Sequence, residues 1–162
     1  MFEKSVNGAL PASSKVWFYF ISRPLTEDEK QIFQTEKANF LSNWNTHGKQ
    51  NSADIQILED KVLMIVADNK DGVSGCSIDK SVAWIKHLSS IWDIDLLDRN
   101  WVVYEDQDKR SVLCKLNLFW AKRKANEIKD STLIWDTTVT TLESFNAAFI
   151  LPFSESWHAR MW

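Results

Sequence analysis

The feature that most constrains the fold is an apolar run followed at once by the start signals of a helix. Residues 16–21 (Val-Trp-Phe-Tyr-Phe-Ile) are aromatic or β-branched without interruption, and such a run predicts a buried strand. Pro24 ends the run. Thr26 and Glu29 then have the spacing of a capping box, in which each side chain bonds the backbone N–H of the other residue. The chain therefore opens with a strand–helix unit.

The predicted first helix carries its apolar residues on one face, as a helix packed on a sheet requires. These residues are Ile32, Phe33, Phe40, Leu41 and Trp44. Gly48, which follows His47, is the expected stop because glycine readily adopts the left-handed conformation that ends many helices.

Two further strands and a second helix follow. Residues 53–58 alternate apolar and polar side chains and residues 62–67 are uniformly apolar, a pattern that predicts a β-hairpin with one inner strand. Apolar residues at helical spacing over 78–92 predict the second helix, and residues 101–104 predict a fourth strand. The order β-α-β-β-α-β is that of ferredoxin-like folds. We therefore expect an α+β protein with two helices on one face of an antiparallel sheet.

The last third of the chain has weaker patterns. Strands are expected at 111–116 and 132–135, and helices at 118–128 and 142–148. The tail 156–162 is too aromatic for a free disordered end, so we expect it to lie back on the protein. We divide the chain into a ferredoxin-like α+β domain, residues 1–110, and a C-terminal α/β extension, residues 111–162, packed on or beside it.

Composition argues against several classes of protein. A net charge of −3 gives no basic footprint for nucleic-acid binding. No window approaches the roughly 18 apolar residues of a membrane-spanning helix, and residues 1–15 lack the apolar core of a signal peptide. The two cysteines have no paired metal-ligand spacing, so we expect a cytoplasmic protein with reduced thiols and no metal. We expect most of the nine tryptophans to be packed in the core.

The leading candidate site is the turn between the strand at 62–67 and the second helix. Five small or polar residues surround Cys76 there: Ser74, Gly75, Ser77, Asp79 and Ser81. The free N–H groups and positive dipole end of a helix favour an anionic ligand, and they make a thiol more nucleophilic. The alternative is structural, with Cys76 as a small buried group and Ser77 or Asp79 as a helix cap.

Three residues outside this turn are candidates to complete a site. His47 is a candidate base for Cys76 if the loop at 45–53 folds back, and otherwise a cation near a helix C-terminus. Arg99, next to Asp98, either anchors a loop or faces an acidic ligand. His158 lies in the aromatic tail, where it either completes a polar pocket or lies at the edge of the packed tail.

Several motifs with known chemistry do not occur in the sequence. The phosphate loop of ATPases, the dinucleotide-binding glycine pattern, the nucleophile elbow and the zinc-protease pattern HExxH are all missing. We therefore expect no cofactor.

Four other motifs occur together: W-x-x-H-G at 44–48, S-G-C-S-I-D at 74–79, D-R at 98–99 and S-W-H-x-R at 156–160. In this combination the chain resembles a family of small uncharacterised bacterial proteins of Bacteroidetes type, many of which carry the name ABC-transporter ATPase. The resemblance covers nearly the whole chain and implies no established activity. The missing phosphate loop argues against the ATPase name.

These observations favour a protein that binds a small polar ligand or a protein partner, with its pocket at residues 74–81. Two alternatives stay open. One is a thiol-dependent enzyme with Cys76 as nucleophile, backbone N–H groups as oxyanion donors, and His47 or His158 as base. The other is an interaction module that holds its partner with surface tryptophans.

Overall fold

The apolar strands of the N-terminal half form the first of two larger sheets. In the computed structural model, which describes residues 10–46, 48–69 and 74–162, these antiparallel strands lie in the order β1-β5-β4. Their bounds are β1 Lys15–Phe20, β4 Ala53–Leu58 and β5 Val62–Ala67. Every side chain of β5 is buried because the central strand is covered on both faces, as its sequence predicts.

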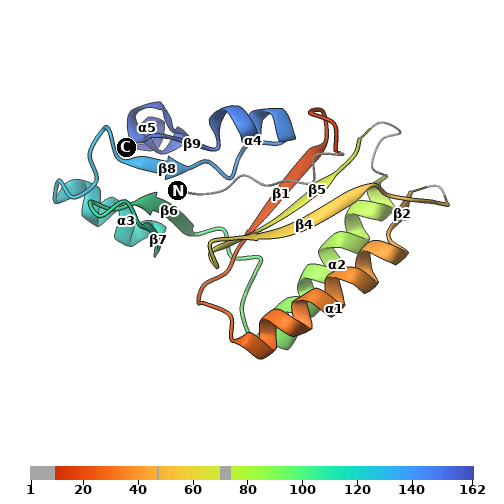
Figure 1. Cartoon of the computed structure of the whole chain (residues 1–162). Coiled ribbons are helices and arrows are strands. Elements are labelled where there is room, and N and C mark those ends of the chain that lie inside the picture. Colours follow the sequence, from red (N-terminus) through yellow and green to blue (C-terminus); the bar gives the residue numbers. More distant parts are fainter. Residues whose placement is uncertain (1–9, 47, 70–73) are drawn as a thin grey trace.

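Two long helices, α1 Glu27–Asn43 and α2 Gly75–Trp92, cover one face of this sheet (Figure 1). The core between helices and sheet includes Phe33, Ile65 and Trp92. α1 ends before the predicted stop at Gly48, because Trp44 has extended backbone and its buried indole N–H donates to the Ser77 carbonyl at 2.8 Å. A two-stranded hairpin follows, with β2 Asn45–Thr46 and β3 Lys49–Gln50.

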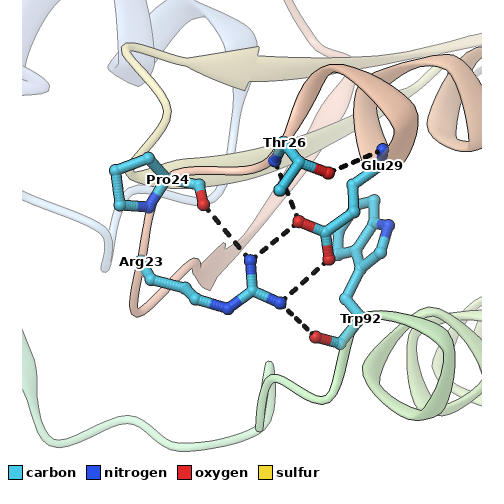
Figure 2. A network of polar contacts seen from close by, with 5 residues as sticks. All are labelled: Arg23, Pro24, Thr26, Glu29 and Trp92. Atoms are coloured by element: carbon cyan, nitrogen blue, oxygen red, sulfur yellow. Dashed lines mark hydrogen bonds and ion pairs between the residues drawn. The ribbon is translucent and has the colours of Figure 1, made fainter.

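A polar network joins the start of α1 to the end of α2 (Figure 2). Arg23 donates to the two carboxylate oxygens of Glu29 at 2.7 and 2.9 Å and to the Trp92 carbonyl at 2.5 Å. The predicted capping box is present, with the Thr26 N–H 2.9 Å from Glu29 Oε1 and the Glu29 N–H 3.2 Å from Thr26 Oγ1. One carboxylate thus caps α1 and, through Arg23, holds α2 beside it.

The second sheet comes from the C-terminal part of the chain, with antiparallel strands in the order β7-β6-β8-β9. Its strands are β6 Trp101–Glu105, β7 Ser111–Lys115, β8 Leu133–Trp135 and β9 Ile150–Pro152. The helices around it are α3 Leu116–Lys124, α4 Leu142–Ala148, the 3₁₀ turn η1 Phe153–Glu155 and α5 Trp157–Met161. Val103, Trp135, Phe145 and Phe149 pack on the face of the first sheet that α1 and α2 leave open. The α+β class is therefore confirmed.

The predicted ferredoxin-like arrangement is met only for its first five elements, β1-α1-β4-β5-α2. The predicted fourth strand, as β6, pairs with β7 and β8 in the second sheet, so this part of the prediction was wrong. The outer edge of β1, where that strand would lie, is occupied by other groups. Val16 donates its N–H to the Thr140 carbonyl at 3.0 Å, and Arg99 donates to the Phe18 carbonyl. The next strand in the sequence, β7, pairs with β6 over five residues.

The predicted division at residues 110 and 111 falls in the turn of the β6–β7 hairpin. The Asp106 N–H donates to the Arg110 carbonyl across this turn at 2.9 Å, and the ladder of the hairpin crosses the predicted boundary. The aromatic tail lies back on the protein as expected, with His158 buried against Phe119 and Trp157. Among the described residues, no helix combines the length and apolar content needed to cross a bilayer.

Candidate functional site

The turn at the start of α2 uses its serines for contacts within the protein. The Ser74 side chain caps the helix by accepting the Ser77 N–H at 3.1 Å. Ser77 is buried, and its hydroxyl donates to the Asn45 carbonyl at 2.6 Å. The buried Ser81 donates to the Ile78 carbonyl at 2.6 Å. The Ser77 hydroxyl thus joins the start of α2 to β2, while the other two bonds lie within the turn and α2 itself. Ligand binding at this turn stays a prediction.

Cys76, Gly75 and Asp79 lie at the surface of the same turn. A Cβ built on Gly75 would meet open space, so no close approach of other atoms requires a glycine there. His47 lies outside the described residues, and the proposed pairing of Cys76 with His47 is therefore untested. Within the described residues, no three His, Cys, Asp or Glu side chains come together as metal ligands.

Arg99 and His158, which are far apart in the sequence, line one cavity of about 380 Å³. It lies where β1 of the first sheet meets β6 and β8 of the second, strands that Figure 1 shows. The remaining lining residues come from those strands, the segment after β8 and the start of α5: Val16, Trp17, Phe18, Phe20, Trp101, Val102, Trp135, Thr137, Thr138, Val139, Thr140 and Trp157. Cys76 is not among them. The structure thus brings together two of the predicted site residues at a place distant from the predicted turn.

Arg99 brings a positive charge to this cavity. Its side chain is exposed, donates one hydrogen bond to the Phe18 carbonyl and lies over the Tyr19 ring, 5.2 Å from the centroid. The neighbouring Asp98 is instead paired with Lys115, at 2.5 Å, and this bond lowers the pKa of Asp98. Among the described residues, no carboxylate forms an ion pair with Arg99. Since a guanidinium has five N–H donors, Arg99 keeps donors for an anionic ligand.

The outer edge of β1 adds a backbone donor. The Val16 N–H points away from β5, toward Thr140. Because backbone groups alternate between the two edges of an antiparallel strand, the N–H and C=O of Phe18 point to that same edge, as the bond from Arg99 to the carbonyl requires. The Phe18 N–H has no hydrogen-bond partner in the part of the chain that the structure describes. It therefore lies on the strand edge at which Arg99 bonds the Phe18 carbonyl.

His158 is a buried residue of the cavity lining. Only 2% of its surface is exposed, and its Nδ1 has no hydrogen-bond partner among the described residues. Its ring stacks on Trp157 at 3.9 Å between centroids. Burial lowers the pKa of His158 to about 4, and the carboxylate of Asp136 opposes this shift. The imidazole is therefore neutral at pH 7, with one donor and one acceptor nitrogen.

Large aromatic side chains form much of the cavity wall. Trp135 is buried, and Trp101 and Trp157 are half-buried. The Lys115 ammonium lies over the Trp101 ring, 4.2 Å from its centroid, and so helps to hold that ring in place.

Sequence reasoning found Arg99 and His158 but missed the other parts of this cavity. The run Asp136-Thr137-Thr138-Val139-Thr140, directly after a predicted strand, was a usable signal, because hydroxyl groups gathered in one loop suit a polar ligand. Thr138 is tied to Asp136 by two hydrogen bonds, at 2.5 and 2.9 Å. The Phe18 N–H carried no signal, because whether it is paired follows from which segment lies beside the edge of β1.

Searches of family models, curated proteins and solved structures found no match to this chain. The resemblance to the bacterial family thus stays a prediction, and the functional argument depends on the geometry of the cavity.

Proposed function

We propose that this protein binds a small organic anion with a planar, apolar body in the cavity between its two sheets. The observation that carries the proposal is the presence of Arg99, without a carboxylate partner, at the edge of an aromatic cavity. A guanidinium and a backbone N–H at the same strand edge are suited to the two oxygens of a carboxylate or to a phosphate.

The size and lining of the cavity support the same class of ligand. A volume of about 380 Å³ lies within the range of roughly 300–1,000 Å³ that is usual for small-molecule sites. Trp101, Trp135 and Trp157 offer flat apolar surfaces, against which planar rings stack well, whereas the Trp17 ring packs against Trp44 on the α1–α2 side of the sheet. A mostly apolar wall with a few polar groups is the usual composition of such sites.

This proposal keeps the predicted class, a ligand-binding protein, and moves the pocket from the α2 turn to the opposite face of the first sheet. The turn at 74–81 lies beside the α1–α2 layer, whereas Val16, Phe18 and Phe20 at the cavity belong to the other face. The interaction module that the sequence leaves open would need exposed tryptophans, and Trp162 is the exposed one among the nine.

Titration with benzoate, a minimal planar anion, tests the proposal. Benzoate should shift the indole N–H signals of Trp101, Trp135 and Trp157 in nitrogen–proton NMR spectra, assigned by substitution of each to Phe. R99Q should weaken benzoate binding by about tenfold or more, since a charge-assisted bidentate contact is lost. R110Q, which removes an exposed arginine outside the cavity lining, should leave the affinity for benzoate unchanged.

Neutral benzamide, which has nearly the same shape, should bind the wild type much more weakly than benzoate. If benzoate moves none of these indole signals, or if benzamide binds equally well, the proposed anion site is wrong.

A further inference from the structure

His158 is a second polar element of the cavity, and the anion site alone gives it no role. Its Nδ1 is buried and unpartnered, and leaving a buried polar atom without a hydrogen bond costs about 1–3 kcal/mol. A native structure keeps such an atom where something else satisfies it. Because His158 lines the cavity, the ligand is the natural partner.

Resting on the proposed anion site, we propose that the ligand is an aromatic acid that also carries an O–H or N–H group, and that His158 accepts a hydrogen bond from this group. Both residues line the cavity, Arg99 as an exposed cation and His158 as a buried imidazole. The acid group of the ligand lies at Arg99, its ring lies among the tryptophans, and its donor reaches inward to His158.

The surroundings of His158 favour the accepting role. Aromatic rings surround the imidazole: Phe119 at 5.4 Å, Trp120 at 6.2 Å and Trp157 at 3.9 Å between centroids. Asp136 is the charged group whose field reaches the ring. An imidazolium would have no lone pair to offer, but the buried ring stays neutral at pH 7 and can accept through one nitrogen. We assign Nδ1 as this acceptor, because a neutral histidine side chain intrinsically prefers its proton on Nε2.

A series of benzoates separates this inference from the anion site itself. Benzoate carries the anion alone, meta- and para-hydroxybenzoate add a donor at two positions, and the matching methoxybenzoates keep the oxygen but remove its proton. At pH 7 we expect one hydroxybenzoate to bind about 5–10-fold more tightly than benzoate, the gain of one buried hydrogen bond. The matching methoxybenzoate should show no gain.

The gain should disappear in H158F, which keeps an aromatic ring, so that benzoate and the hydroxybenzoates bind H158F with equal affinity. H87F is the matched control, since His87 lies on the surface of α2 beside Glu36, and it should keep the full preference. R99Q should weaken every member of the series.

A second measurement needs no substitution and applies even if H158F fails to fold. In the wild type, nitrogen NMR of the histidine rings should show an unprotonated Nδ1 in His158 that shifts with the preferred hydroxybenzoate and not with benzoate. Equal binding of benzoate and both hydroxybenzoates would overturn the inference and leave the anion site standing. A methoxybenzoate that binds as tightly as its hydroxy partner, or a protonated Nδ1, would also overturn it. If no member of the series binds, both proposals fall together.

Discussion

At the scale of single residues, burying a neutral imidazole makes folding depend on pH. The pKa of His158 is about 4 in the folded protein against an ordinary value of 6.5, mainly because of burial. Between these values the unfolded chain binds a proton that the folded protein does not, so stability is complete above pH 6.5 and is lost as the pH falls toward 4. The free energy of unfolding should fall by up to about 1.4 kcal/mol per pH unit in this window.

Urea unfolding of wild type and H158F at pH values from about 7 down to about 4.5 measures this dependence. H158F should lose the part of the slope that lies between pH 6.5 and 4, while H87Q, on the exposed face of α2, should keep it. A wild-type slope in H158F would show that another group carries the effect.

Residue-level prediction succeeded where the signal is local and failed where it depends on contacts. The capping box of Thr26 and Glu29 is readable from a spacing of three residues, and it is present. Arg99 and His158 were recognisable as polar residues that need a partner. That they share a cavity follows from pairing between distant segments, such as the bond from Arg99 to the Phe18 carbonyl, and no local pattern encodes this pairing.

At the scale of elements, Glu29 is the residue through which two helices depend on each other. The hydrogen bond from Arg23, followed by that from the Thr26 N–H, lowers the pKa of Glu29 from 4.5 to about 2. Since this pKa is depressed in the folded state, the contribution is present above about pH 4.5 and is lost as the pH falls toward 2. E29Q should lower the midpoint temperature of unfolding by a few degrees at pH 7, and by less at pH 3.

E27Q is the matched control in the same helical turn, because the Glu27 side chain is 86% exposed and its ion pair with Lys30 is long, at 3.5 Å. Such surface pairs contribute little to stability. Thermal unfolding followed by circular dichroism compares the two variants, and equal effects of E27Q and E29Q would contradict a linking role for Glu29.

The pairing of whole strands is the step that sequence patterns left undetermined. The apolar pattern of β6 suits a place beside β1 as well as a place beside β7, since Val102 and Val103 are buried on opposite faces in the observed sheet. The choice depends on which edges are free. The segment after β8, rather than β6, lies at the edge of β1, where the Thr140 carbonyl accepts the Val16 N–H. Because β6 does not pair with this edge, there is room for the cavity beside it.

At the scale of the whole molecule, the two sheets share an aromatic core that should make them unfold together. Phe18 of β1 stacks on Phe149 at the end of α4, at 5.2 Å between centroids, and Phe149 also contacts Trp135 of β8 at 5.3 Å. Phe149 is fully buried. F149A should therefore destabilise the protein by about 3–5 kcal/mol, the usual cost of removing a buried phenylalanine.

Fluorotryptophan signals can follow each part separately, with Trp84 reporting on α2 and Trp135 on the second sheet. Both signals should change at the same urea concentration in the wild type, and both midpoints should fall equally in F149A. L118A, which truncates a side chain that is 50% exposed, should leave both midpoints nearly unchanged. Separate midpoints, or a shift of the Trp135 signal alone in F149A, would mean that the C-terminal part folds as an independent module and that the cavity lies between two units that can separate.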